Sequence, residues 1–519
     1  MNTVEFLRLS SEIVPDRTAI IFEDKRIDFS TLQQRVNKLA DSLSKLGVVP
    51  GDRVSTIQVN CNEHIEAYFA ITSLDAIYVP VNFRVRSEEL EVMLSDSKPK
   101  VIFAGSRYHE LVKEATKNNN DAKLFVSMDD ESQGWINYDD LIRDGESEDR
   151  FPEYDDDDTN IIMYTSGTTG SPKGVMLKHD SFSSYILANV MPADPDEEEK
   201  NILTVPLHHI AGMQAVISAI YGGRTLVIQR QFEPYDWMRL VQDEQINRAM
   251  MVPTMLKAIL DHKEFSNFDI SSLGVITYGA APMPASVIKD AIAKLPGTRF
   301  INAFGQTETA STITMLSPED HEITGTPEEQ ELKLKRLSSI GKPLDDVIVQ
   351  IVDEEGKEVI QGDVGEIVAQ GPRLMKGYWN KEDATNETIR DGWLYTGDLG
   401  YMDSEGYIFL SGRAKDFIKR GGEMIAPDEV ENVILTHSSI DDAAVIGVND
   451  EYWGERVRAV VVLKSGMSVD QQEIIDYCHE RLASYKKPES VIFAQEIPKN
   501  PMGKILKREL RDMYPEPIE

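Results

Sequence analysis

Cysteine is scarce in this sequence, with Cys61 and Cys478 as the only two among 519 residues. Two cysteines so far apart make neither a disulfide framework nor a cysteine metal cluster, and a reducing cytoplasm is the expected location. Long apolar runs are also missing, because no stretch approaches the roughly 20 apolar residues that a membrane span needs. Residues 1–14 carry Glu5 and Glu12 and no basic segment before an apolar core, so no signal peptide is expected.

Positive charge is in short supply as well. The chain has 54 lysines and arginines against 88 aspartates and glutamates, which gives a net charge of −34 at pH 7. Such a charge argues against a nucleic-acid partner, whose phosphates would be repelled. The acidic runs at residues 153–158 and 194–199 are predicted to be solvated loops. The length and the 41% of hydrophobic residues predict a globular protein with at least two domains, and the oligomeric state stays open, a homodimer being one option.

The most informative stretch is residues 163–174, M-Y-T-S-G-T-T-G-S-P-K-G. An apolar strand is predicted before it at residues 160–162, and a short helix after it at residues 179–190. Glycines allow sharp turns, and such a loop can aim backbone N–H groups, hydroxyls and one ammonium at a polyanion. The common P-loop spacing is absent, because Lys173 is followed by Gly174. A flexible surface linker is the alternative, but the place between a strand and a helix favours a nucleotide-phosphate loop.

This run resembles the signature of the acyl-adenylate-forming superfamily, which contains acyl-CoA synthetases, peptide-synthetase adenylation domains and firefly luciferase. Further motifs follow in that family's order, at residues 206–212, 278–282, 300–308, 393–398, 411–423 and 497–505. The resemblance covers about residues 10 to 510. It implies an α/β fold. We expect a large N-terminal region of α/β layers with a small β-rich subdomain (residues 1–412), a hinge (413–415) and a mobile small α+β C-terminal domain (416–519).

Some of these residues have a simpler interpretation when taken alone. A histidine beside apolar residues is usually part of a core; the family spacing P-x-x-H-x-x-G selects His209, although His208 stands beside it. Small residues after the predicted strand 273–277 suit an ordinary turn as well as a flat ligand. Asp398 follows a glycine, and Gly-Asp commonly marks an exposed turn. The resemblance instead places these residues in a binding site.

The resemblance assigns roles to individual residues. Asn302 would meet the adenine amino group and Phe304, where tyrosine is frequent, would stack on the ring. The residues implied for ATP or AMP are Thr165, Ser166, Gly167, Thr168, Thr169, Gly170, Lys173, Gly279, Ala280, Ala281, Asn302, Ala303, Phe304, Gly305, Thr307, Asp398 and Arg413. Those implied for catalysis are Lys504, Glu308, His209 and Lys415, the last as hinge; for the acyl pocket His209, Met213 and Tyr278; for CoA Lys419, Gly421 and Gly422; and for Mg²⁺ Glu308 and Thr165.

The rest of the chain is predicted to be scaffold. Residues 1–150 alternate helices and strands, with Ser30 capping a helix that Gly47 closes and a strand at residues 54–59. No chemistry is identified in this part. In the last hundred residues we expect helices at 428–435 and 469–482 and strands at 458–463 and 490–494.

The implied activity is an ATP-dependent acyl-CoA ligase that uses ATP, Mg²⁺ and coenzyme A. A carboxylic acid would become acyl-AMP with release of pyrophosphate, and CoA would then take the acyl group and release AMP. Residues 206–213 contain no carboxylate to pair with an amino group, which favours a medium- or long-chain fatty acid or an aryl acid over an amino acid. The alternatives are an enzyme that loads a carrier protein, a luciferase-like oxygenase and a non-catalytic relative; the last is disfavoured because Lys504, Glu308 and Asp398 are all retained.

Overall fold

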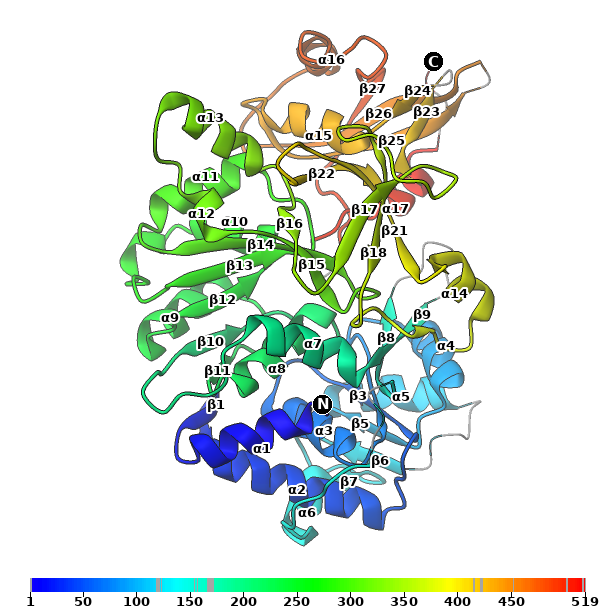
Figure 1. Cartoon of the computed structure of the whole chain (residues 1–519). Helices are drawn as coiled ribbons and strands as arrows, with labels where there is room; N and C mark the ends of the chain where they lie inside the picture. Colours follow the sequence, from blue (N-terminus) through cyan, green and yellow to red (C-terminus); the bar gives the residue numbers. More distant parts are fainter. Residues whose placement is uncertain are drawn as a thin grey trace.

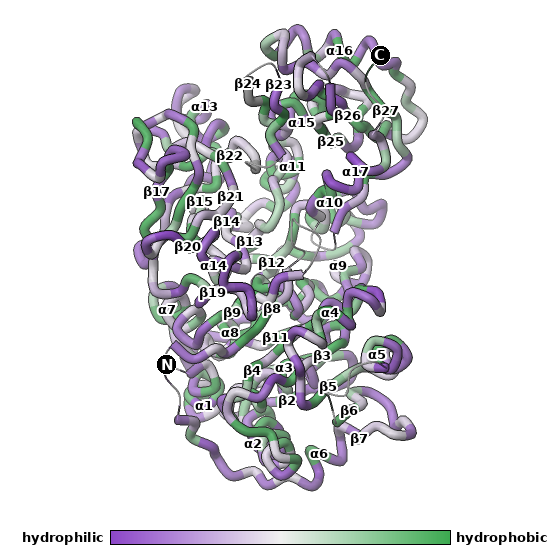
Figure 2. Tube along the Cα trace, turned by 90° about the vertical axis from the view of Figure 1, so that its right-hand side faces the viewer, coloured by the Kyte–Doolittle hydropathy of each residue, from purple (hydrophilic) through white to green (hydrophobic). Residues whose placement is uncertain are grey.

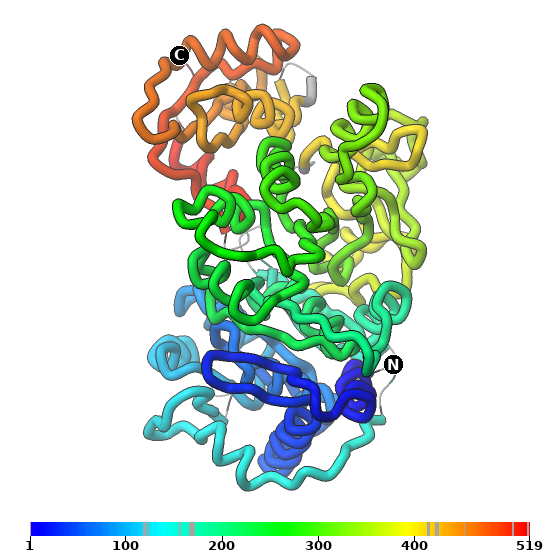
Figure 3. Tube along the Cα trace, turned by 90° about the vertical axis from the view of Figure 1, so that its left-hand side faces the viewer, coloured from blue at the N-terminus to red at the C-terminus, as the bar shows by residue number. Residues whose placement is uncertain are grey.

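The computed structural model of this chain has a mixed α/β fold with a large N-terminal region and a small C-terminal unit, as predicted (Figure 1). The structure describes residues 2–117, 122, 124–153, 155, 157–165, 172–413, 416–420, 423–450, 452–500, 503–515 and 518. Figures 1 and 3 both show the orange-to-red C-terminal segment at one end of the molecule and the blue N-terminal segment at the other.

The first large sheet is mainly parallel in its centre and antiparallel at both edges. The parallel pairing of β12 with β13 and of β13 with β14 brings the ends of three strands to one edge of the sheet. In spatial order its strands are β16 (Lys342–Pro343), β15 (Ser311–Leu316), β14 (Arg299–Gln306), β13 (Val275–Gly279), β12 (Arg248–Met251), β10 (Lys200–Leu203), β11 (Thr225–Ile228), β1 (Thr18–Phe22) and β2 (Lys25–Asp28).

The second large sheet is built from the N-terminal segment and the flanks of the predicted phosphate loop. Its inner strands are parallel, whereas β8 and β9 form an antiparallel hairpin around residues 166–172. In spatial order its strands are β19 (Gly377–Tyr378), β9 (Lys173–Lys178), β8 (Thr159–Thr165), β4 (Ile77–Pro80), β3 (Arg53–Ile57), β5 (Val101–Ala104), β6 (Leu124–Ser127) and β7 (Ile136–Asn137).

Two smaller sheets complete the fold. The antiparallel β-rich sheet contains β17 (Ile348–Val352), β18 (Gly365–Gln370), β21 (Trp393–Met402), β20 (Ile389–Arg390) and β22 (Ile408–Arg413). The C-terminal sheet contains β24 (Glu423–Ile425), β23 (Ile418–Arg420), β26 (Gly454–Leu463), β25 (Ile440–Asp450) and β27 (Ser490–Phe493). This last unit has buried clusters of its own, which extend from Ile418 to Leu510.

Figure 2 shows hydrophobic segments along the inner strands. Helices surround the sheets. They are α1 (Val4–Ile13), α2 (Phe29–Lys45), α3 (Asn62–Thr72), α4 (Ser87–Ser97), α5 (His109–Thr116), α6 (Tyr138–Asp144), α7 (His179–Asn189), α8 (Ile210–Tyr221), α9 (Pro234–Glu244), α10 (Pro253–Leu260), α11 (Ala285–Lys294), α12 (Pro318–His321), α13 (Pro327–Arg336), α14 (Glu382–Thr388), α15 (Pro427–Leu435), α16 (Gln471–His479) and α17 (Lys507–Met513), with 3-10 turns η1 (Ser106–Tyr108) and η2 (Phe265–Asn267). Within the described part of the chain, no helix is both long and apolar enough to span a membrane.

The start of α2 corrects one prediction. Asp28, not Ser30, is the N-cap, because its side chain accepts a hydrogen bond from the backbone N–H of Thr31. An N-cap residue needs extended backbone, and Ser30 already lies inside the helix. The predicted end is close to the observed one, with Gly47 in the left-handed region at φ 88°.

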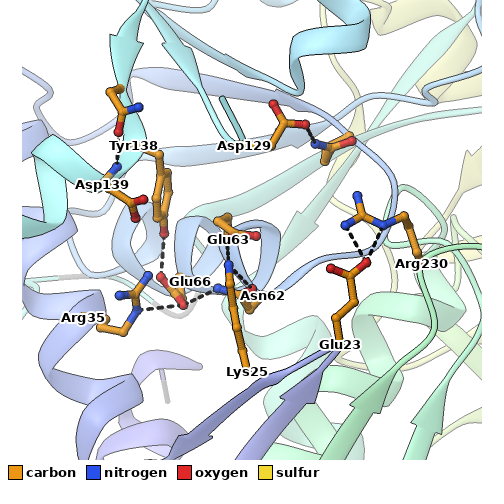
Figure 4. A network of polar contacts seen from close by, with 12 residues as sticks. Glu23, Lys25, Arg35, Asn62, Glu63, Glu66, Asp129, Tyr138, Asp139 and Arg230 are labelled. Carbon is orange, nitrogen blue, oxygen red and sulfur yellow. Dashed lines mark hydrogen bonds and ion pairs between the residues drawn. The ribbon is translucent and has the colours of Figure 1, made fainter. Parts of the chain in front are cut away.

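Helix α3 is buried along its whole length, and its carboxylates are paired (Figure 4). Glu66 is 0% exposed and accepts hydrogen bonds from Arg35 Nε (3.0 Å), Asn62 Nδ2 (2.9 Å) and the Tyr138 hydroxyl (2.7 Å). Glu63 pairs with Lys25. Because a buried charge is costly unless it is hydrogen-bonded, this network joins three segments of the N-terminal region.

Candidate functional site

The predicted phosphate loop leaves β8 at Thr165 and enters β9 at Lys173, and these two residues face each other in the hairpin. The Thr165 hydroxyl lies 3.5 Å from the carbonyl oxygen of Lys173. The ammonium of Lys173 lies 4.9 Å from the centre of the Tyr378 ring. Eight of the predicted site residues lie outside the described residues: Ser166, Gly167, Thr168, Thr169, Gly170, Lys415, Gly421 and Gly422.

Strands β13 and β14 bring the two predicted adenine segments side by side. In their parallel pairing Tyr278 stands opposite Asn302 and Gly279 opposite Ala303. A Cβ atom on Gly279 would lie 2.1 Å from the carbonyl oxygen of Ala303. The close approach of the two strands therefore requires glycine at this position, whether or not a ligand also lies against it.

The same argument applies at Gly305, where a Cβ atom would lie 1.6 Å from the carbonyl oxygen of Ser311. Beyond β13, Ala280 is exposed and adopts a left-handed conformation with φ 66°. Such strain in a non-glycine residue often marks a binding site. Ala281 and Thr307 are half-buried and lie just beyond the ends of β13 and β14.

Asn302 and Phe304 lie on β14 and are half-buried. The side-chain amide of Asn302 donates to the carbonyl oxygen of Ser339 over 3.2 Å. The ring of Phe304 packs against the main hydrophobic core. Their contacts with adenine stay predictions.

Glu308 follows β14 and is held at two points. The Tyr378 hydroxyl donates to Glu308 Oε1 over 3.0 Å, and the backbone N–H of Met375 donates to the Glu308 carbonyl oxygen over 2.9 Å. Glu308 as a residue is half-buried, which is compatible with binding of a cation at its carboxylate.

Asp398 is not in an exposed turn, which corrects the simpler interpretation of that motif. It lies within β21 and is 6% exposed. Gln306 Nε2 donates to Asp398 Oδ2 over 2.6 Å. Asp398 also stands opposite Arg413 in the pairing of β21 with β22. The two residues predicted to bind ribose are thus neighbours in the sheet, and Gln306 joins Asp398 to β14.

His209 is the N-cap of α8. The motif's glycine has a structural reason, since a Cβ atom on Gly212 would lie 2.4 Å from the carbonyl oxygen of Pro206. Burial, and secondarily the charge of Arg84, lower the pKa of His209 to about 4. Its imidazole is therefore neutral at pH 7 and cannot supply a positive charge to the site.

The two other residues predicted for the acyl pocket are buried in the core. Met213 is 1% exposed on α8, and Tyr278 is 0% exposed on β13. The Tyr278 hydroxyl forms a hydrogen bond of 2.8 Å with His321 Nε2. Their approach to an acyl group stays a prediction.

A cavity of about 290 Å³ lies beside these elements. Two cationic side chains line it. Arg84 is exposed to solvent, and Arg230 forms an ion pair with Glu23 (Figure 4). Its lining comprises Asn60, Phe83, Arg84, Thr204, Pro206, Arg230, Gln231, Phe232, Thr254 and Met255.

The loop that carries Lys504 is docked against this cavity. A Cβ atom on Gly503 would lie 2.8 Å from Thr254 Oγ1, on the cavity wall. The Lys504 backbone N–H donates to Asn500 Oδ1 over 2.9 Å, which shapes the loop. An ion pair of 3.0 Å between Lys257 and Asp441 joins α10 to β25. Lys419, predicted for CoA, lies on β23, where its backbone N–H donates to Glu455.

The donor set can be tested against a magnesium ion. Among the residues that the structure describes, no three histidine, cysteine or carboxylate side chains gather as a metal cluster. Mg²⁺ commonly takes only one or two carboxylates and completes its shell with water and substrate phosphates. The single hydrogen-bonded carboxylate of half-buried Glu308 fits this mode of binding, whereas an all-protein metal cage does not fit.

Sequence reasoning missed the residues that connect the site. Tyr378 contacts both Lys173 and Glu308, and Gln306 contacts Asp398. Arg84 comes from the segment predicted to be scaffold. The one signal available was position: Gln306 lies inside the motif at residues 300–308, and Tyr378 follows Gly377 in β19.

Comparison with known proteins places the chain among similar sequences along most of its length. Residues 8–379 match the family described as AMP-binding enzyme, and residues 429–504 match the AMP-binding enzyme C-terminal domain. The chain is 34% identical over 494 residues to the long-chain-fatty-acid–CoA ligase FadD13 of Mycobacterium tuberculosis, covering 95% of this chain and 94% of that protein. It is 30% identical over 515 residues to the indoleacetate–CoA ligase of Aromatoleum aromaticum, covering 99% and 98%.

The fold has solved counterparts as well. The crystal structure of the anthranilate CoA ligase AuaEII in complex with anthranoyl-AMP superposes with a TM-score of 0.89 at 25% sequence identity. The match covers 99% of this chain and 97% of that one.

Proposed function

This chain belongs to the AMP-binding enzyme family, and from that premise we propose that it is an ATP-dependent acyl-CoA ligase for a fatty or aryl acid. The acid and ATP form acyl-AMP and pyrophosphate, and CoA then yields the acyl-CoA and AMP. The residues predicted for ATP, for Mg²⁺ and for CoA are part of this proposal.

The observation that carries the proposal is a set of contacts by which two further residues, Tyr378 and Gln306, link the predicted site residues. Lys173 lies over Tyr378, whose hydroxyl contacts Glu308. On the same strand end, Gln306 contacts Asp398. Residues from distant parts of the chain are thereby gathered at one edge of the first sheet, as a single nucleotide site requires.

The chemistry of the first step is mainly electrostatic. A carboxylate is a poor acyl donor, and adenylation gives it AMP as a leaving group. Both reactants are anions, so the barrier depends on positioning and on positive charge. Lys173 and the loop amides would bind the phosphates, a Mg²⁺ ion held by Glu308 would neutralise them, and Lys504 would place its ammonium between the carboxylate and the α-phosphate.

The second step needs a different arrangement, because Lys504 has no role when the thiol attacks. We propose that the small domain (residues 416–519) rotates about a hinge at residues 413–415. The structure has the Lys504 loop docked on α10 through Gly503 and Thr254, and this proposal assigns that arrangement to the first step. The hinge residue Lys415 would absorb the change of backbone angles.

The cavity beside α10 supports an anionic reactant. Arg84 provides positive potential in a protein whose net charge is −34, whereas Arg230 is paired with Glu23. Phe83, Phe232 and Met255 add apolar wall, which suits an acyl or aryl group. The similar proteins act on a long-chain fatty acid and on indoleacetate, and this proposal takes one of these two acid classes for the chain.

The test is pyrophosphate release from ATP across a panel of fatty, aryl and amino acids, with and without CoA. The proposal expects release with one fatty or aryl class, made catalytic by CoA with accumulation of AMP. Release of about one equivalent that ignores CoA would identify a carrier-protein-loading enzyme instead. Release with amino acids alone would contradict the proposed substrate class.

A further inference from the structure

Tyr378 lies between Lys173 and Glu308, two residues of the proposed site. It ends β19, which pairs with β9 so that Tyr378 stands opposite Val175. Its backbone N–H donates to Thr385 Oγ1 over 2.9 Å, and the residue is only 7% exposed. Backbone pairing, a side-chain acceptor and burial therefore fix the position of this ring.

The ring makes two contacts of opposite kind. Its hydroxyl donates to the carboxylate of Glu308 over 3.0 Å, and its face lies 4.9 Å from the ammonium of Lys173. One side chain thus holds both an anion and a cation of the proposed nucleotide site.

Each contact has a consequence for binding. A hydrogen bond to Oε1 sets the rotation of the Glu308 carboxylate and leaves Oε2 for a cation, as partners of metal ligands commonly do. Mg²⁺ demands near-ideal octahedral geometry, so the rotation of a ligating carboxylate matters. An aromatic face attracts an ammonium and restricts the flexible lysine side chain.

We propose that Tyr378 is a positioning residue for adenylation: its hydroxyl presents Glu308 to the metal, and its ring holds Lys173 toward the phosphates. The inference rests on the proposed function, and in particular on Glu308 as a metal ligand. In this proposal Tyr378 acts through Glu308 and Lys173.

The test separates the two contacts with two variants. Tyr378→Phe keeps the ring and removes the hydroxyl, whereas Tyr378→Leu removes both. Binding of Mn²⁺ to the protein with a non-hydrolysable ATP analogue is measured by electron paramagnetic resonance, alongside the Mg²⁺ dependence of pyrophosphate release. Tyr378→Phe is expected to raise the metal concentration at half-saturation about 10-fold. Tyr378→Leu is expected also to lower kcat at saturating metal about 10-fold.

Tyr138→Phe is the matched control. It too removes a buried tyrosine hydroxyl that donates to a carboxylate, that of Glu66, but it does so in the network of Figure 4, within the scaffold. We expect it to leave the metal dependence unchanged even where it lowers the unfolding temperature. In a Glu308→Gln background, Tyr378→Phe should add no further loss of metal affinity, because its target is already gone.

The outcomes distinguish this inference from the function on which it rests. An unchanged Mn²⁺ affinity in Tyr378→Phe, or an equal change in Tyr138→Phe, overturns the role of Tyr378. The role is also overturned if Tyr378→Phe lowers the metal affinity by the same factor in the Glu308→Gln background as in the wild type. A wild-type protein that binds Mn²⁺ and the analogue but releases no pyrophosphate with any acid contradicts the ligase proposal alone.

Discussion

The docking of the Lys504 loop depends on Gly503, and its replacement by alanine gives a sharp prediction. Gly503 has φ 75°, and an added Cβ atom would lie 2.8 Å from Thr254 Oγ1 and 3.0 Å from Thr254 Cγ2. Overpacking of this kind costs about 1–3 kcal/mol. Because the contact exists only with the loop docked, we expect Gly503→Ala to slow acyl-AMP formation by about 5- to 150-fold.

The structure also supplies a rescue and a control. Thr254→Ala removes both crowding atoms and leaves the Cβ of residue 254 at 3.5 Å from the Cβ added at position 503, which is an ordinary contact. The double variant should therefore regain much of the lost rate. Gly466→Ala places alanine at a similar φ of 78° with no atom within 4 Å, and therefore tests backbone strain alone.

The assay compares two half-reactions. Acyl-AMP formation is followed by pyrophosphate release, and thioester formation by the consumption of supplied acyl-AMP with CoA. Gly503→Ala should affect the first step and spare the second. The reasoning fails if both steps slow equally, or if Thr254→Ala gives no rescue.

Three further predictions concern two lysines and one half-buried aspartate. Lys504→Ala should lower acyl-AMP formation by at least about 10²-fold while thioester formation from supplied acyl-AMP persists; equal loss of both would remove Lys504 from its proposed role. Lys415→Pro, which fixes φ, should keep adenylation and lose thioester formation, and a normal rate of acyl-CoA production would contradict the hinge. Burial, and next the charge of Asp158, raise the pKa of half-buried Asp75 to about 6, which is above its value in the unfolded chain. Ionisation of Asp75 therefore destabilises the fold fully above pH 6 and not at all below about pH 4. Asp75→Asn should therefore raise the free energy of unfolding at pH 7 by about 1 kcal/mol after solvent screening, with the gain gone at pH 4 in urea unfolding; a gain independent of pH would count against this cause.

Local signals in the sequence predicted much of the fold. The strand before the phosphate loop is observed as β8 and the helix predicted at residues 179–190 as α7, because apolar strands and helical spacing are local properties. The place of the loop between a strand and a helix was wrong, because β9 comes directly after it and pairs with β8 before α7 begins. The cap of α2 was misplaced by two residues, since Asp28 and Ser30 are both good caps and the backbone decides between them.

The contacts that assemble the site could not be predicted in the same way. Tyr378 and Glu308 are 70 positions apart, and Gln306 and Asp398 are 92 apart. The first pair depends on how the second large sheet lies against the first, and the second pair on how the β-rich sheet does. No periodicity in the sequence records either arrangement. Arg84 was overlooked because one charged residue in a scaffold segment carries no motif.

The cation-walled cavity has a kinetic consequence in so acidic a protein. At long range an anionic reactant meets the field of a body with a net charge of −34 and is repelled. Only within about one Debye length, roughly 8 Å at physiological ionic strength, do local arginines outweigh that field. Dissolved salt shortens the reach of the repulsion more than it weakens the close contacts. Encounter with ATP, CoA and the acid should therefore quicken as ionic strength rises, the reverse of an enzyme that steers its substrates by attraction.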